Sequence, residues 1–497
     1  MTPRWTDEAD VVVVGTGAGG ATAARVLSEA GLEVLMLEEG PDLRGVERPE
    51  QLLEALALTM RDFGSQTTAG PVPMPLLQGR LVGGSTAINS GIVWRLPEDV
   101  RRDWVDRFGL GELLEARALE RAFERIEREL EVTETPLALY GGNNGKMAEA
   151  AARLGLPGKP IARNARRCEG RARCLQGCPS RARQSMDVSY VPRAIEMGAR
   201  LRARARVERI VVRGGRATGV RGTLDDGDRR VPFEARARRA VVVAAGALHT
   251  PILLRRSGLR RGVGDRFQAH PGSAVVGRFD EPVVMAFGAT QGYEVPLRER
   301  GFKLETLALP PEMLAARLPG AGAEWQRRLV ELDRYAQWCA QVRFRALGTV
   351  RPGWSGRPVV RYVPTDDDLA RMQAAIALLC EMMFAAGATE VFPGLGGLPE
   401  VLDRPEQVRL VREARLSRRD FHLIASHLFG TACAHADRAH GVVDARLRAH
   451  DVERLYVMDA SVFPTNLGVN PQHSIMAVVW LAAERLAADA GAMRAAA

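Results

Sequence analysis

A glycine-rich stretch near the N-terminus restricts the fold of this chain more than any other feature. Val11–Val14 form a β-branched apolar run, which is typical of a buried parallel strand. Gly15, Gly17 and Gly20 follow with the spacing G-x-G-x-x-G. The first glycine permits a tight turn, the second lets backbone approach a pyrophosphate, and the third allows close helix packing. The next segment, ATAARVLSEA, predicts a helix whose N-terminus would hold phosphate charge.

A second strand continues this nucleotide-binding pattern. EVLMLEEG carries Glu38 at its end, where a carboxylate can bind ribose hydroxyls. The sequence LEEG resembles the corresponding segment of flavoproteins, which hold the adenosine half of FAD at this point. A further apolar strand within 238–259 ends in Ala244-Ala245-Gly246, where many FAD enzymes return the chain to the nucleotide. Val207 lies in a strand that often contacts adenine through its backbone. These features favour FAD over NAD.

The segment QGRLVGGSTAINSGIVWRLP (78–97) points to a particular family. Gly83-Gly84-Ser85 with Asn89 resembles the signature of the glucose–methanol–choline (GMC) oxidoreductases, in which this loop lines the FAD pyrophosphate and isoalloxazine. Adjacent glycines let backbone lie against the cofactor, and Ser85 can donate a hydrogen bond to phosphate. Some relatives carry a histidine that is joined covalently to the flavin at the position of Ile88. The resemblance therefore implies non-covalent FAD here.

The C-terminal segment 426–487 strengthens the resemblance. It contains H-x-x-G-T, G-V-V-D, L-Y-V-x-D-A-S-x-F-P and G-V-N-P, and the likeness extends over about 8–100, 163–275 and 420–490. The family usually shows Arg-Met-Gly soon after G-T, whereas this chain has Ala-Cys-Ala-His at 432–435. That departure leaves the shape of this loop open, but not the fold.

Two residues match the family's catalytic pair. The resemblance implies that the enzyme oxidises an alcohol, with His427 as the base and Asn470 orienting the substrate oxygen. Histidine suits this role because it accepts a proton near neutral pH. Asn470-Pro471 also has the pattern of a helix start, with asparagine as cap and proline at the first helical position. His473, one turn along, either faces the flavin or supports that cap, and we expect His270, His422 and His435 to be structural or surface residues.

The resemblance implies an α/β chain with a Rossmann-like FAD-binding domain and a second, α+β substrate-binding domain built on an antiparallel sheet. We expect residues 8–275 and 426–490 to form the first, with a cysteine-bearing insertion at about 160–190, and 276–425 to form the second. The residues expected at the cofactor are Gly15, Gly17, Ala18, Gly19, Gly20, Glu38, Arg80, Gly83, Gly84, Ser85, Asn89, Val207, Ala245, Asp459, Asn470, Pro471 and His473.

The variable part, about 276–425, gives weaker signals. GSAVVGRF, WCAQVRFRA and RPVVRYV alternate as strands of an antiparallel sheet do, and 369–387 reads as a buried core helix. Residues 305–320 place apolar side chains between prolines, which indicates a lid, a lipid contact or ordinary packing. The shortage of aromatic residues and the leucine, alanine and methionine bias favour a lipophilic or long-chain alcohol as substrate.

Cys168, Cys174 and Cys178 form a C-x5-C-x3-C pattern followed by proline. Thiolates bind iron–sulfur clusters and zinc, and this spacing lets three of them converge. The segment resembles one that binds a [3Fe-4S] cluster in multi-subunit GMC sugar and polyol dehydrogenases, which pass electrons to a cytochrome subunit. Similar segments occur in GMC enzymes acting on long-chain alcohols. A cluster, a disulfide, free buried thiols and zinc all remain open, as does the electron acceptor: oxygen, a quinone or dye, or a cytochrome. A non-oxidative GMC-fold lyase or decarboxylase is a further alternative.

Composition excludes some partners. The formal net charge is +9, but arginines supply nearly all the positive charge and are scattered from end to end, and aromatic residues make up only 5%. A nucleic-acid binder would concentrate basic residues with aromatics among them, so we expect no nucleic-acid partner. We see no signal-peptide pattern and no apolar run of about 20 residues. We expect a cytoplasmic location, with export alongside a partner or peripheral membrane contact as alternatives.

Overall fold

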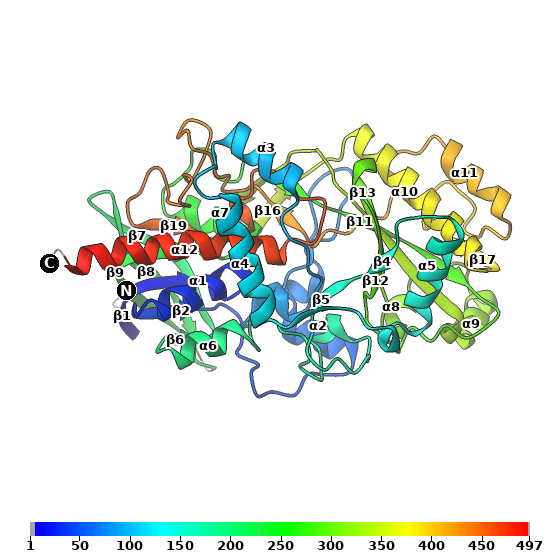
Figure 1. Ribbon diagram of the computed structural model, residues 1–497, viewed down its shortest axis with the longest axis horizontal. Helices are drawn as coiled ribbons and strands as arrows, with labels where there is room; N and C mark the ends of the chain where they lie inside the picture. The colour runs from blue at the N-terminus through cyan, green and yellow to red at the C-terminus, as the bar shows by residue number, and fades with distance from the viewer. Residues whose placement is uncertain (1–4, 228, 496–497) are drawn as a thin grey trace.

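Two β-sheets form the frame of the protein in its computed structural model, which describes residues 5–227 and 229–495 (Figure 1). The first is a seven-stranded sheet in which β6, β2, β1, β9, β8 and β7 follow one another and β19 also pairs with β9. Its parallel core joins β1 to β2 and β9, β2 to β6, and β9 to β19. The bounds are β1 (Trp5–Val14), β2 (Val34–Leu37), β6 (Arg200–Arg202), β7 (Ala205–Arg213), β8 (Arg216–Asp225), β9 (Arg230–Val243) and β19 (Leu455–Val457).

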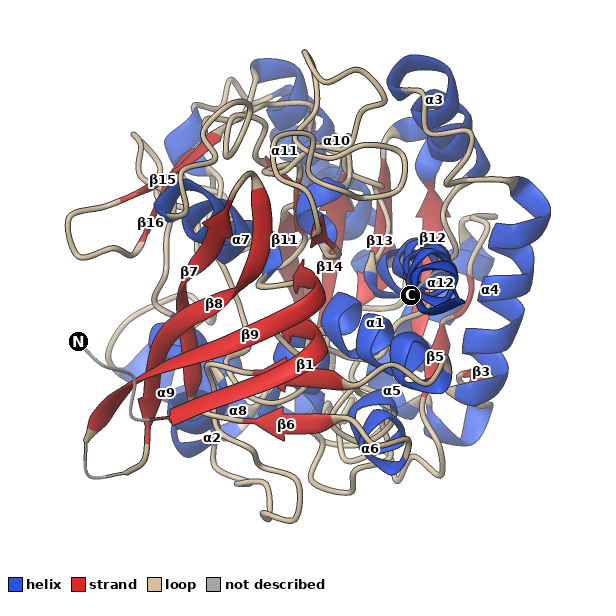
Figure 2. Cartoon of the chain, turned by 90° about the vertical axis from the view of Figure 1, so that its left-hand side faces the viewer, coloured by secondary structure: helices blue, strands red, loops and turns tan. Residues whose placement is uncertain are grey.

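Helices cover this sheet because its central strands β1 and β9 end in the apolar runs Val11–Val14 and Ala240–Val243, which are buried. Figure 2 shows α1 (Ala18–Glu29), α12 (Gln472–Ala495) and α4 (Ala116–Glu129) grouped on one side of β1 and β9, with α6 (Tyr190–Glu196) below α1. α7 (Gly246–Arg256) lies beside β7. Val11–Val13 are fully buried between these layers. This is the Rossmann-like arrangement that the sequence predicts.

The second sheet has six strands, all antiparallel, in the order β17, β11, β14, β13, β12, β4. α10 (Asp366–Ala385) and α5 (Gly141–Arg153) pack on one of its faces, and α11 (Val408–Glu413) packs on α10. The predicted α+β domain on an antiparallel sheet is therefore present. The bounds are β4 (Lys159–Pro160), β11 (Gly272–Arg278), β12 (Tyr293–Leu297), β13 (Phe302–Thr306), β14 (Tyr335–Val342) and β17 (Glu390–Phe392).

Smaller elements connect the two sheets. β10 (Gln268–Ala269) pairs with β18 (Leu428–Phe429), and the predicted strand in RPVVRYV belongs to a separate two-stranded sheet of β15 (Thr349–Pro352) and β16 (Pro358–Arg361). The remaining elements are α2 (Leu52–Thr59), α3 (Glu98–Phe108), β3 (Val132–Glu134), β5 (Ala162–Asn164), α8 (Pro311–Ala315) and α9 (Ala323–Val330). β4 lies well before residue 276 and β11 begins before it, so the chain crosses between the sheets more than once. The domain boundaries stay a prediction.

Of the described helices, none is long and apolar enough to cross a membrane. The start of α12 differs by one residue from the sequence expectation. The amide of Ile475 donates to the carbonyl oxygen of Pro471 (2.9 Å), and the helix runs from Gln472. Pro471 therefore occupies the cap position that the sequence assigned to Asn470.

The glycine turn shows why its spacing is needed. Gly15 has φ +99°, a left-handed conformation that favours glycine. A Cβ on Gly20, in the first turn of α1, would lie 2.0 Å from the carbonyl oxygen of Gly15. A Cβ on Gly19 would lie 1.9 Å from the carbonyl oxygen of Met458, directly after β19. The helix therefore touches both the turn before it and the C-terminal part of the sheet.

We predict that Gly20→Ala lowers the free energy of unfolding by at least about 2 kcal/mol, because its Cβ would overlap backbone. Gly145→Ala is the matched control, since Gly145 also lies in a helix and has open space where a Cβ would point. It should stabilise the protein by about 0.5–1 kcal/mol. Denaturant unfolding of both variants measures this, and equal stability of the two would contradict the packing.

Candidate active site

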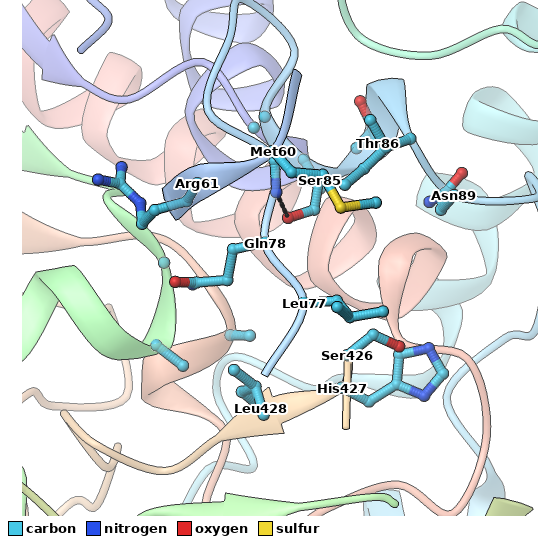
Figure 3. Close-up of a pocket in the computed structure, with 18 of the residues that line it drawn as sticks. Met60, Arg61, Leu77, Gln78, Ser85, Thr86, Asn89, Ser426, His427 and Leu428 are labelled. Atoms are coloured by element: carbon cyan, nitrogen blue, oxygen red, sulfur yellow. Dashed lines mark hydrogen bonds between the residues drawn. The ribbon is translucent and has the colours of Figure 1, made fainter. Parts of the chain in front are cut away.

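A cavity of about 620 Å³ is lined by residues of both sheets and by the connections between them. Fourteen of the predicted site residues line it, and they come from segments far apart in the chain. They are Gly15, Gly17, Ala18, Gly19, Glu38, Gly84, Ser85, Asn89, Val207, Ala245, His427, Asp459, Asn470 and Pro471. Figure 3 shows His427 and Ser426 on the segment that leads into β18, across the view from Ser85, Thr86 and Asn89. The fold thus brings most of the predicted site together.

Four predicted cofactor residues do not line this cavity. Gly20 and Gly83 lie just behind it: the amide of Gly83 donates to Thr16 Oγ1 (3.1 Å). Arg80 is exposed and lies 3.9 Å from Glu39. His473 is fully buried in α12 away from the cavity, and both of its ring nitrogens are without a hydrogen-bond partner in the described structure.

Glu38 is held at the end of β2 by three hydrogen bonds. Its carboxylate accepts from the amide (3.0 Å) and hydroxyl (2.8 Å) of Thr16 and from the amide of Gly40 (2.9 Å). Burial raises the pKa of this carboxyl, and these bonds oppose the shift. Each carboxylate oxygen can accept more than one hydrogen bond, so Glu38 keeps capacity for ribose hydroxyls. The position at the end of the strand is the one that the sequence predicts.

The sequence interpretation missed residues that surround this end of the cavity. Glu39 accepts from Arg61 (2.7 Å), and His249 lines the cavity from α7. Burial would raise the pKa of Glu39, but Arg61 and neighbouring cationic groups hold it at about 2. Burial lowers the pKa of His249 to about 3. The doubled acid in LEEG was a visible signal for Glu39, whereas nothing local marks His249.

The geometry of the glycine turn and the 83–85 loop fits a dinucleotide. Gly17 has open space where a Cβ would point, at the N-terminus of α1 and on the cavity wall. The 83–85 loop approaches so closely that a Cβ on Gly84 would lie 3.0 Å from the Cα of Gly17. Gln78, His249 and Asn470 each bring to the cavity a buried polar atom without a partner in the described structure. An anion on the free amides of the turn is what such a helix terminus stabilises.

His427 is paired with His270, which the sequence interpretation expected to be structural. Their Nδ1 atoms lie 3.3 Å apart, and the amide of His270 donates to the carbonyl oxygen of His427 (3.0 Å). The β10–β18 pair creates this juxtaposition across 157 residues of sequence. Because Nδ1 of His427 faces His270, Nε2 is the nitrogen left for a ligand in the cavity.

Burial and the nearby charge of Lys303 keep both rings neutral. They lower the pKa of His427 to about 3, and burial, His427 and Lys303 lower that of His270 well below its usual value. Lys303 itself is fully buried, and although burial opposes its charge, Glu294 and Glu305 raise its pKa. An imidazole that is neutral at physiological pH can accept a proton.

Asn470 reaches the cavity on a loop that polar side chains fix to β10. Gln268 Nε2 donates to the carbonyl oxygen of Pro464 (2.7 Å), and Gln268 Oε1 accepts from the amide of Asn466 (3.2 Å). Asn466 Oδ1 then accepts from the amide of Gly468 (3.1 Å). The Oδ1 of Asn470 is buried and has no hydrogen-bond partner among the described residues. The side chain is therefore available to a ligand rather than used as a helix cap.

Asp459 and Asn89 organise the cavity rather than point freely into it. Asp459 accepts from the amide of Gly246 (2.9 Å), the hydroxyl of Thr250 (2.6 Å) and the amide of Ser461 (2.8 Å). Burial raises the pKa of its carboxyl against these bonds. Asn89 Nδ2 donates to Gln472 Oε1 (2.7 Å), which ties the 83–89 loop to the first turn of α12.

The cysteine loop lies behind the 87–90 segment. Arg163, which is buried, donates through Nε to the carbonyl oxygen of Ser90 (3.0 Å), while Nη2 lies 3.5 Å from Cys174 Sγ and Nη1 3.9 Å from Cys168 Sγ. The amide of Arg183 lies 3.4 Å from Cys178 Sγ. Leu175, next to Cys174, lines the cavity. The loop therefore supports the cofactor-lining segment from behind.

This geometry does not fit a [3Fe-4S] cluster, one of the alternatives that the sequence leaves open for these cysteines. Within residues 5–227 and 229–495, no three histidine, cysteine or acidic side chains are placed to hold a metal ion, and all six cysteines are free thiols. A cluster would require three thiolates to converge on iron. Instead, the guanidinium of Arg163 contacts two of the three sulfurs. We derive no electron transfer through this loop.

The site geometry agrees with comparison to known proteins. A family model described as GMC oxidoreductase matches residues 9–272, and its C-terminal counterpart matches 349–478. The chain belongs to the GMC oxidoreductase family. This confirms the resemblance, and with it a flavin-dependent oxidoreductase acting on CH–OH groups.

Relatives and solved structures extend this result. A GMC-type oxidoreductase of Mycobacterium tuberculosis is 40% identical, over 98% of this chain and 77% of the relative. A long-chain-alcohol oxidase of Arabidopsis thaliana is 25% identical over 97% of this chain and 67% of its own length. Pyridoxine 4-oxidase from Mesorbium loti (TM-score 0.70, 19% identity, 96% and 98% coverage) and formate oxidase from Aspergillus oryzae (0.72, 17%, 98% and 99%) share the fold.

We predict that Gly17→Val weakens FAD binding at least about tenfold without destabilising the apoprotein. The backbone at Gly17 is extended (φ −68°, ψ −167°), and no protein atom lies within 4 Å of a Cβ there, so the side chain would enter the cavity. FAD titration followed by flavin fluorescence measures the affinity, and apoprotein unfolding measures stability. Unchanged FAD affinity would contradict the placement of the cofactor.

A second prediction concerns His473 and acid stability. Burial lowers the pKa of His473 to about 3, whereas an unfolded histidine titrates near 6.5, so the unfolded chain binds the extra proton between these values. Its contribution to stability is therefore complete above about pH 6.5 and falls by about 1.4 kcal/mol per pH unit on acidification. His473→Leu should flatten the loss of unfolding free energy between about pH 6.5 and about pH 4. Parallel curves for parent and variant would contradict it.

Proposed function

We propose that this protein oxidises an alcohol CH–OH group to a carbonyl with non-covalently bound FAD, using His427 as the base and Asn470 to orient the substrate oxygen. The observation that carries the proposal is the placement of a neutral His427 and an unpartnered Asn470 Oδ1 on one cavity with the glycine turn. FAD, when bound, accepts the two electrons and the carbon-bound hydrogen that leave the alcohol. The hydrocarbon side chain of Ile88 has no nucleophilic atom that could form a covalent link to the flavin.

His427 takes the hydroxyl proton at Nε2. For this, the lone pair must lie on Nε2 and the proton on Nδ1, which then donates to Nδ1 of His270 (3.3 Å). His270 accepts only while its own proton is on Nε2, and burial favours such a neutral ring. His270 is thus a positioning residue that selects the tautomer of the base. Lys303 disfavours double protonation of either ring.

Molecular oxygen is the acceptor that we propose for the second half of the cycle. The support is the similarity to long-chain-alcohol oxidases, together with a cysteine loop whose geometry does not fit an electron-carrying cluster. A lipophilic alcohol, the substrate class expected from the sequence, agrees with the names of these relatives and stays a prediction. A lyase or decarboxylase reaction would leave the flavin oxidised at the end of each turnover, so reduction by alcohol under anaerobic conditions separates the two classes.

We predict that His427→Ala slows anaerobic flavin reduction by about 10²–10⁴-fold, the usual contribution of a general base, and retains FAD. His422→Ala is the matched control because His422 also lines the cavity but is exposed and has no part in the base pair. It should keep the rate of the parent. Stopped-flow absorbance with a reducing alcohol measures both variants. An undiminished rate in His427→Ala would contradict the assignment.

A further inference from the structure

The wall of the cavity formed by the six-stranded sheet is polar, although the sheet's other face is apolar. Across β13 and β14, Leu304 pairs with Ala340 and Phe302 with Val342, and these side chains belong to the core that α10 and α5 cover. The residues at the alternate positions are polar: Glu305 pairs with Cys339. Strand geometry sends successive side chains to opposite faces, so the cavity faces the polar set.

Three residues of β14 at alternate positions line this wall: Gln337, Cys339 and Gln341. Glu305 and Gln291 complete it, with Gln291 Nε2 donating to Glu305 Oε1 (2.8 Å). Gln337 and Glu305 are each only 1% exposed. A wall of buried polar side chains is costly unless each polar group finds a partner.

Glu305 is already neutralised and so does not call for a cationic substrate. Lys303 Nζ lies 2.7 Å from Glu305 and 2.8 Å from Glu294, both at buried positions, and Lys159 Nζ lies 3.6 Å from Glu294, so two cations face two carboxylates. The negative charge facing the cavity is therefore paired from behind. The groups that this wall can bind on a ligand are therefore neutral hydrogen-bond donors rather than cations.

Two amide oxygens on this wall lack partners. Gln337 Nε2 donates to the carbonyl oxygen of Leu307 (3.2 Å), which fixes the amide and leaves Oε1 without a hydrogen-bond partner in the described structure. Gln341 Oε1 is likewise buried and unpartnered there. An unmet buried acceptor costs about 1–3 kcal/mol, which a hydroxyl of a bound ligand would recover.

Aliphatic side chains line the cavity beside this polar wall, since the amide of Leu307 donates to the carbonyl oxygen of Gln337 (3.0 Å). Leu307, Leu309 and Met313 line it from the 305–320 segment, and Leu175 adds to it from the cysteine loop. No Phe, Tyr or Trp is among the described residues that line the cavity. A ligand here can therefore contact both amide groups and aliphatic carbon, with the guanidinium of Arg317 also on the cavity.

We propose that the substrate is an amphipathic aliphatic alcohol that carries at least one further hydroxyl group, which donates to Gln337 Oε1 or Gln341 Oε1, and an alkyl part packed on Leu307, Leu309 and Met313. This rests on the proposed function, because the same cavity must hold the reacting carbinol near His427. It refines the expectation of a purely lipophilic substrate, which would leave both amide oxygens buried and unsatisfied.

The test uses the FAD-loaded enzyme and three probes: octan-1-ol, an octanediol with its second hydroxyl in mid-chain, and sorbitol. Dissociation constants come from the perturbation of the oxidised flavin spectrum, and rates come from anaerobic flavin reduction. The octanediol should bind at least about fivefold more tightly than either other probe, the effect of one net hydrogen bond. Of Gln337→Leu and Gln341→Leu, the variant that removes the acceptor of the second hydroxyl should remove about that factor for the octanediol, and both should leave octan-1-ol unchanged or tighter.

Gln326→Leu, at an exposed position of α9, is the control for a glutamine-to-leucine change and should behave as the parent. Equal binding of octan-1-ol and the octanediol, or no effect of Gln337→Leu and Gln341→Leu, would overturn the polar half of the proposal. Tighter binding of sorbitol than of the octanediol would overturn the apolar half. Binding without flavin reduction by any probe would contradict the proposed function instead, because the dissociation constants still report the selectivity of the wall.

Discussion

The close contact between the start of α1 and the end of β19 holds the site together. A Cβ at Gly19 would lie 1.9 Å from the carbonyl oxygen of Met458, so only glycine lets the nucleotide-binding helix touch the C-terminal strand. Asp459, the next residue, fixes the start of α7 through Gly246 and Thr250. In the adjoining 460–462 turn, backbone carbonyl oxygens accept hydrogen bonds from the amides of Ala432 (2.8 Å) and Ala434 (2.8 Å). These two residues come just after the segment that carries His427. A packing constraint in the N-terminal motif thereby helps to set where the segment that carries His427 lies.

The buried charge of Lys303 in the second sheet also affects more than one part of the cavity. Lys303, buried between Glu294 and Glu305, lies on the cavity side of the second sheet and acts in two directions. Toward the β10–β18 pair, it helps to keep His427 and His270 neutral. Toward the β14 wall, it pairs with Glu305, and the β14 side chains of that wall are the neutral groups of Gln337, Cys339 and Gln341. One buried cation therefore links the protonation of His427 to the polarity of the cavity wall.

Local patterns were enough to predict the nucleotide site, because its strand, turn, helix and acid are contiguous in sequence. Features that depend on pairing between distant segments were not predictable in this way. The QWCAQ stretch reads as a strand, but only the register with β13 decides that Gln337 and Gln341 face the cavity. His270 looked structural because its partner lies 157 residues away. The cysteine spacing allowed a cluster, and the outcome turned on Arg163, which β5 places against two of the sulfurs.

The central claim is that the cavity removes a carbon-bound hydrogen from an alcohol whose hydroxyl proton goes to His427. The most direct measurement is rapid-mixing anaerobic reduction of the enzyme-bound flavin by an alcohol deuterated at the carbinol carbon, compared with the unlabelled alcohol. The account predicts that the flavin is bleached by both and markedly more slowly by the deuterated alcohol, because breaking the C–H bond belongs to the reductive step. A flavin that stays oxidised with every alcohol tried, or a bleaching rate that deuteration leaves unchanged, would contradict it.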